Sequence, residues 1–224
     1  MKNSCFRFAT VFTVLVLALS SLSSLGPAYS QNNKYPLSAF ISSTRDQAIL
    51  DALYELVDTP AEGSLKEITG TPVRVFFKNL NEFNRALKNY DALSWLSPDG
   101  QHVIFINIKH KNAPKEALAA IIAHEVLHND PDNSVQEEIT GWTQEAIIWQ
   151  LMKQRNPALG RIPTSQYALV DRLNRIESEY KRGSLGQLVR GNPGYQGLPE
   201  TSPGFDGTPH VARGETQSGR LASQ

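Results

Sequence analysis

The stretch EALAAIIAHEVLHNDPDNSVQEE, residues 116–138, determines how the chain is organised, because it places two histidines and a glutamate at the end of an apolar segment. The run from Ala117 to Ala123 is apolar on every side, which predicts a helix that is buried in a core. Ionisable side chains in such a segment cost free energy unless something pairs with them. The stretch therefore predicts both a core helix and a specific partner for its polar side chains.

The sequence HEVLH, residues 124–128, has HExxH spacing on this predicted helix. Residues i and i+4 lie one above the other on a helix, so His124 and His128 can bind the same cation. Glu125 then lies beside them, where a metal-bound water would be. Two imidazoles with an acid between them are better satisfied by a cation than by carbonyl or hydroxyl groups. We therefore predict that His124 and His128 are metal ligands and that Glu125 is catalytic.

A third ligand has to come from another part of the chain, because catalytic zinc sites usually have three protein ligands and one open position. The connection 129–133 is short enough only to reverse the chain, so the helix that begins at Ser134 should run antiparallel to the first. At about 1.5 Å per residue, Glu138 lies level with the histidines and Glu145 lies beyond the metal. Glu137 has the spacing of a capping box with Ser134. We predict Glu138 as the third ligand, with Glu137 as the alternative. Two imidazoles and one carboxylate favour Zn²⁺.

The rest of the chain shows the periodicities of helices and strands. They predict helices at 44–58, 81–93, 114–129, 134–155 and 164–183, a strand at 71–77, and a hairpin of 93–96 with 102–108. This order indicates an α+β fold, in which a small mixed sheet packs with its hairpin on the HExxH helix and further helices follow.

The N-terminus has the layout of a secretory signal peptide. Lys2 and Arg7 precede an apolar run from Phe8 to Leu19, and Ala28-Tyr29-Ser30 supplies the small residues of a cleavage site. The apolar run is shorter than the roughly 20 residues of a spanning helix. We predict cleavage after Ser30, export to the periplasm or the extracellular medium, and no stable membrane insertion after cleavage. The single cysteine, Cys5, lies in this segment, so the mature chain would have no thiolate ligand.

These observations divide the chain into a signal peptide (1–30), a metal-binding domain (31–182) and a tail (183–224). The tail is rich in glycine and proline and has little apolar periodicity, which predicts disorder. Its composition is compatible with a tether, a partner-binding segment or an inhibitory segment. The chain has 22 basic and 22 acidic residues, and this balance gives no reason to expect nucleic acid as a partner. The oligomeric state is not indicated.

HEVLH followed by a glutamate on the next helix resembles the zinc metallopeptidases of the gluzincin type, and the hairpin before the motif helix is similar to their minimal zincin-like core. The resemblance covers about Val73 to Trp149. It implies a secreted zinc-dependent metallopeptidase with Glu125 as general base on a zinc-activated water, and an edge strand that binds a peptide or protein substrate by β-augmentation. Many gluzincins have Asp or Asn four residues after the ligand glutamate, whereas this chain has Gly141 or Trp142 there.

Several assignments stay open at this stage. The donor that stabilises the oxyanion is commonly a tyrosine or histidine outside the motif, and His102, Tyr167 and Tyr180 are candidates. Asp130 is a candidate for orienting a histidine, although it also suits the turn. The alternative function is a non-catalytic zinc-binding or partner-binding domain on a zincin scaffold. Glu125 separates the two functions, because a domain that only held zinc would not need this acid.

Overall fold

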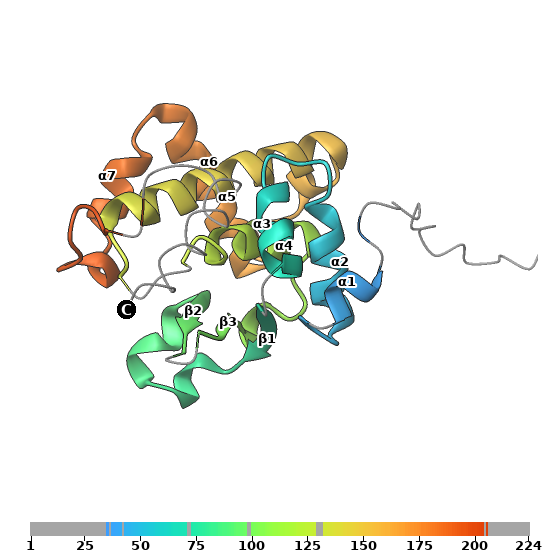
Figure 1. Cartoon of the computed structure of the whole chain (residues 1–224). Coiled ribbons are helices and arrows are strands. Elements are labelled where there is room, and N and C mark those ends of the chain that lie inside the picture. Colours follow the sequence, from blue (N-terminus) through green and yellow to red (C-terminus); the bar gives the residue numbers. More distant parts are fainter. Residues whose placement is uncertain are drawn as a thin grey trace, which may run out of the picture. The chain divides into compact units, whose positions relative to one another are not determined.

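The computed structural model describes residues 35, 37–41, 43–70, 73–97, 100–128, 132–203 and 205, and these residues contain seven α-helices and one three-stranded sheet (Figure 1). The helices are α1 (Leu37–Ile41), α2 (Gln47–Glu55), α3 (Glu62–Gly70), α4 (Lys115–Glu125), α5 (Val135–Arg155), α6 (Ala168–Arg182) and α7 (Leu185–Arg190). The strands are β1 (Arg74–Lys78), β2 (Ala92–Leu96) and β3 (His102–Asn107). The α+β prediction is confirmed, and the predicted signal peptide lies outside the described residues.

The sheet has the order β1-β3-β2, with β1 parallel and β2 antiparallel to β3. The β2–β3 pair is the predicted hairpin. Val75, Ile104 and Ile106 are buried on one face, where they join the main core with α4, whereas Phe76 and Trp95 are exposed. This alternation is what a strand period of two requires when one face of a sheet is covered. Because β2 is at the edge of the sheet, it has backbone groups that β3 does not pair.

The segment 81–93, predicted as a helix, instead forms two short 3-10 turns, Leu80–Glu82 and Arg85–Asn89, before β2 begins. The side chains of Asn79 and Asn84 accept hydrogen bonds from the backbone N–H groups two residues later. Asparagine side chains compete in this way with continuous helical hydrogen bonding. The turns carry the chain from the β1 edge of the sheet to the start of β2.

Helix α4 is buried along almost its whole length, as its sequence predicts. It begins after Pro114 and ends at Glu125, earlier than the predicted end at 129. The last turn tightens, because Leu127 N–H donates to His124 O (2.8 Å) and His128 N–H donates to Glu125 O (3.3 Å). Such three-residue spacing is common where an α-helix ends. His128 therefore follows the helix directly and remains close to His124.

Helices α5 and α6 agree with the predicted segments. Ser134 is the N-cap of α5 and accepts from Glu137 N–H at 3.3 Å, and α6 ends at Gly183, whose φ of 72° suits glycine. Helix α5 packs on α4, and α6 packs on α5. None of the helices in the described residues is both long enough and apolar enough to cross a membrane.

The structure corrects the prediction of a disordered tail over most of 184–203. Helix α7 and a 3-10 turn at Pro193–Tyr195 lie in this segment. Leu185 and Val189 are buried with Trp142 in a second apolar cluster. Apolar residues spaced three and four apart are enough to dock this segment, although its average composition is that of a disordered chain. Residues 206–224 lie outside the described residues.

Candidate metal centre

Two histidines, at the end of α4 and just after it, point their Nε2 atoms at the same place. The Nε2 atoms of His124 and His128 are 3.1 Å apart, and the ring centroids are 5.1 Å apart. His124 is buried, with 3 % of its surface exposed, and His128 is half-buried. A separation this short places both nitrogens where they can share one cation, as the i, i+4 spacing predicts.

Glu138, in the first turn of α5, completes a group of three ligand atoms that lie within 4.8 Å of one another. One carboxylate oxygen, Oε2, is 3.5 Å from His124 Nε2, and the other, Oε1, is 3.6 Å from His128 Nε2. Asn133 donates to Oε1 at 2.6 Å, whereas the buried Oε2 has no hydrogen-bond partner among the described residues. Glu138 is therefore the carboxylate that faces both Nε2 atoms, and its role as the third ligand, chosen over Glu137, stays a prediction.

Two further glutamates of α5 bind the opposite nitrogens of the histidine rings. Glu145 forms a short contact with His124 Nδ1, and Glu137 Oε1 is 3.0 Å from His128 Nδ1. A carboxylate at Nδ1 fixes the tautomer that leaves Nε2 free to bind a metal. Glu137 gives its backbone N–H to Ser134, but its carboxylate binds His128 instead of returning to the cap.

The sequence analysis places Glu145 beyond the metal, and in the structure its carboxylate is in contact with Nδ1 of His124, on the side of the ring away from the Nε2 atoms. Its partner His124 precedes His128 by about one helical turn, and α5 runs antiparallel to α4, so the later residue Glu145 meets the earlier histidine. Arg172 of α6 binds both oxygens of Glu145, at 2.9 Å from Nη2 to Oε1 and by a short contact from Nη1 to Oε2. The Nε of the same guanidinium is 3.1 Å from Asp91 Oδ2.

The three residues are close enough to hold a metal ion, and the charges around them suit a cation. Zinc bonds of about 2.1 Å would place neighbouring ligand atoms about 3.4 Å apart. The two Nε2 atoms are 3.1 Å apart, and they lie 3.5 and 3.6 Å from different oxygens of Glu138. Burial opposes protonation of His124, but Glu138 and Glu145 outweigh it and raise the pKa of His124 to about 10. Burial also works against ionisation of Glu138, but His124 and His128 lower its pKa to about 2. A buried pocket with this excess of carboxylates attracts positive charge, as protons or as a metal ion.

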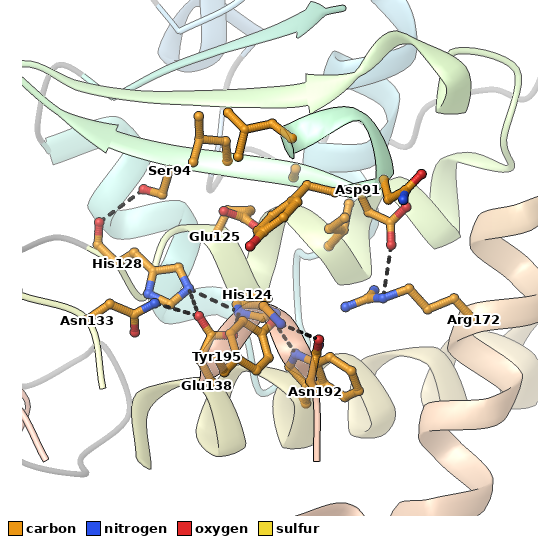
Figure 2. A pocket seen from close by; sticks show the side chains of 18 of the residues that line it. Asp91, Ser94, His124, Glu125, His128, Asn133, Glu138, Arg172, Asn192 and Tyr195 are labelled. Atoms are coloured by element: carbon orange, nitrogen blue, oxygen red, sulfur yellow. Dashed lines mark hydrogen bonds and ion pairs between the residues drawn. The ribbon is translucent and has the colours of Figure 1, made fainter. Parts of the chain in front are cut away.

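Glu125, the last residue of α4, is 8 % exposed and lines the cavity beside the histidines. Burial raises the pKa of Glu125, and the two histidines counteract this effect. In Figure 2 its carboxylate lies on the side of His124 that faces the strand with Ser94. The side chain is therefore placed to exchange a proton with a molecule that enters the cavity.

The cavity that contains these groups has a volume of about 1170 Å³ and lies between two walls. One wall is the edge strand β2, which contributes all of its residues. The other is formed by α6 and by the C-terminal segment, including Asn192, Tyr195 and Leu198. Figure 2 shows Asp91 and Arg172 at one end and Ser94 and Asn133 at the other. A space of this size and openness can accept several residues of an extended chain.

None of the three candidate donors lines this cavity. His102 is buried on β3, 2.6 Å from Ser94 Oγ, and burial together with His128 lowers its pKa to about 4. Tyr167 packs against the main core, and Tyr180 is exposed on α6. His102 instead contacts the site through Ser94. The same Ser94 Oγ that lies next to His102 donates to the backbone carbonyl oxygen of His128 at 3.0 Å. Asp130 lies outside the described residues.

Tyr195, which the sequence analysis missed, does line the cavity. Its hydroxyl accepts from Trp142 Nε1 at 3.1 Å. Burial and the neighbouring Glu138 carboxylate raise the pKa of Tyr195, so the hydroxyl keeps its proton. The sequence analysis places Tyr195 in a disordered tail. The spacing of Leu185, Leu188 and Val189 is the signal that could have indicated an ordered segment there.

Gly141 allows α5 to approach the metal ligands. A Cβ atom at this position would lie 2.6 Å from His124 Nε2 and 2.8 Å from Cγ of the same ring. Any larger side chain would therefore displace the imidazole.

Comparison of the chain with protein-family models, curated proteins and solved structures finds no match.

Proposed function

We propose that the chain is a zinc-dependent metallopeptidase of the gluzincin type, with a zincin-like catalytic domain. The observation that supports this proposal most directly is the convergence of His124 Nε2, His128 Nε2 and Glu138 around a buried carboxylate oxygen without a hydrogen-bond partner. Glu125 lies in the same cavity, where a metal-binding site alone would not require it.

His124, His128 and Glu138 would hold the ion, and Glu145 and Glu137 would hold the histidine rings in place. Zinc, when bound, lowers the pKa of a coordinated water toward about 7 and polarises a carbonyl group. Carboxylates in this outer position also make the imidazoles stronger ligands.

Glu125 would act as the general base and then as the general acid. It accepts a proton from the water that attacks the scissile carbonyl, and it passes that proton to the leaving amine. Burial raises the pKa of Glu125, which brings the carboxylate closer to the pKa at which both transfers are efficient near neutral pH.

Two other groups would bind the substrate. Tyr195 lines the cavity and keeps its hydroxyl proton, so it can donate a hydrogen bond to the oxygen of the scissile carbonyl. The free edge of β2 can pair with the backbone of an extended peptide. Together these groups would hold the peptide bond between β2 and the C-terminal wall of the cavity.

Zinc content is the first test of this proposal. The protein is reconstituted with zinc, dialysed and analysed by plasma mass spectrometry, for the wild type and for His124→Ala, Glu138→Ala and Glu125→Gln. We expect about one zinc per chain in the wild type and in Glu125→Gln, and much less in the two ligand variants. No stoichiometric zinc in the wild type would remove the basis of the proposal.

Peptide cleavage by wild type and Glu125→Gln is the second test. Glu116→Gln is the matched control, because Glu116 is equally buried on the same helix but binds Asn156 away from the site. We expect Glu125→Gln to lose at least about 100-fold in kcat with its zinc retained, and Glu116→Gln to stay active. Zinc binding with no cleavage of any peptide in the wild type would favour the alternative, a non-catalytic zinc-binding domain.

A further inference from the structure

The N-terminus of α5, which carries Glu137 and Glu138, is covered by residues 199–202 of the C-terminal segment. Val135 N–H donates to Pro199 O at 2.9 Å, and Gln136 N–H donates to Glu200 O at 3.0 Å. The first N–H groups of a helix have no partner within the helix itself. Pro199 and Glu200 supply two of these partners, so the segment fixes the turn of α5 that holds the third ligand.

Ser202 extends this contact to a histidine ligand. Its hydroxyl donates to Glu137 Oε2 at 3.3 Å, and the other oxygen of Glu137 is 3.0 Å from His128 Nδ1. Ser202 is 4 % exposed and Glu137 is 1 % exposed, so water does not readily replace either partner. Loss of a hydrogen bond by a buried carboxylate costs free energy, and the carboxylate becomes free to rotate. The position of the His128 ring therefore depends on a hydroxyl more than 60 residues later in the chain.

The C-terminal segment, residues 184–203, is anchored to the helical half of the fold at separate points. Tyr195 accepts from Trp142 Nε1, Leu185 and Val189 pack in the second apolar cluster, and Arg190 pairs with Glu200. These contacts reach α5, α6 and the segment itself. The segment therefore docks as a unit against the helix that carries Glu137, Glu138 and Glu145.

We propose that residues 199–202 form an outer support of the metal centre, in which Ser202 is a positioning residue that acts on His128 through Glu137. Metal binding and docking of the C-terminal segment are then linked, so each stabilises the other. The linkage rests on the candidate metal site and not on peptidase activity. Release of this segment would weaken zinc binding without any change in the three ligands.

Two measurements on the full chain test the linkage. The first is the zinc Kd, determined by competition with a chromogenic chelator, for the wild type, Ser202→Ala and Ser202→Thr. Ser184→Ala is the matched control, since the Ser184 hydroxyl also binds a carboxylate of this region, Glu179, at 2.5 Å but far from the ligands. We expect Ser202→Ala to weaken zinc binding by about 10- to 100-fold, and we expect Ser202→Thr to restore it. Ser184→Ala should retain the wild-type Kd.

The second measurement is hydrogen exchange of the wild type with and without zinc, which requires no variant to fold. We expect zinc to slow exchange of amides in 184–203 and at the start of α5. Equal zinc Kd values for wild type and Ser202→Ala, or exchange in 184–203 that zinc leaves unchanged, would overturn the linkage. Failure of the wild type to bind zinc would overturn it together with the proposed metal site. Zinc binding and protected amides without peptide cleavage would support the linkage while contradicting the peptidase.

Discussion

Glu145 and His124 are 21 residues apart and in direct contact, and both are buried. Arg172 binds the same carboxylate and continues to Asp91 at the start of β2. A continuous chain of charged groups therefore joins a candidate metal ligand to the edge strand that forms the opposite wall of the cavity.

Replacement of Arg172 tests this chain of charges. In Arg172→Met, Glu145 would remain buried without its cation, and Asp91 would lose one partner. We expect a decrease of about 3 to 5 kcal/mol in the free energy of unfolding, measured by urea titration. The control Arg182→Met breaks a solvent-exposed ion pair on the same helix and should change the free energy of unfolding much less. Equal effects of the two changes would contradict the structural role of Arg172.

Gly141→Ala tests the close approach of α5 to His124. The added methyl group would overlap the imidazole, so we expect zinc binding to weaken by about tenfold or more. Gly70→Ala is the control, because a Cβ atom there meets nothing within 4 Å. The zinc Kd of both variants is compared with that of the wild type. An unchanged Kd for Gly141→Ala would show that the ring does not occupy this position.

Zinc affinity should depend on pH. The pKa of His124 is about 10 in the metal-free site, so its proton has to leave when zinc binds at neutral pH. At pH values below this pKa, zinc has to displace the proton of His124. The apparent affinity for zinc should therefore fall by about tenfold for each unit of pH decrease. Competition titrations at pH 6, 7 and 8 measure this slope. An affinity independent of pH would mean that zinc does not bind at His124.

Tyr195→Phe tests the hydroxyl as a donor to the substrate. If Tyr195 stabilises the developing oxyanion, we expect kcat per bound zinc to fall by about 100- to 1000-fold, with a smaller change in KM. Tyr180→Phe is the control, because Tyr180 lies exposed on α6. Wild-type kcat in Tyr195→Phe would mean that the donor is another residue of the cavity.

His102 should lower stability in acid. Its folded pKa is about 4, whereas the unfolded chain has a value near 6.5, so the unfolded state binds the proton first as the pH falls. The stability that neutral His102 provides is complete above pH 6.5 and is lost by pH 4, a difference of about 3 kcal/mol. The difference between wild type and His102→Gln, measured in chelator from pH 7 to 4, isolates this effect. A constant difference would contradict it.

The sequence predicted those parts of the site that local spacing determines. The HExxH spacing located the two histidines and Glu125, and the short connection before Ser134 placed Glu138 level with them. Glu145, Arg172 and Asp91 could not be placed, because their meeting depends on how α5, α6 and β2 pack. The same holds for Tyr195 and Ser202, which approach the site only because a few apolar residues dock a segment of polar average composition.

The predicted helix at 81–93 failed for a different reason. Its apolar pattern is weak, and asparagines at 79 and 84 form local turns that compete with a continuous helix. By contrast, the stronger apolar patterns of α5 and α6 predicted those elements well.

Helix α5 carries Glu138, the candidate third ligand, and both carboxylates that contact the Nδ1 atoms of the histidines. The candidate centre is therefore formed by α5 and the end of α4, and not by five independent side chains. A sliding movement of α5 along α4 would shift Glu137, Glu138 and Glu145 in concert. Damage to this packing should therefore abolish metal binding in a single step. The absorption spectrum of a cobalt ion bound in the site would report changes in the register between the two helices.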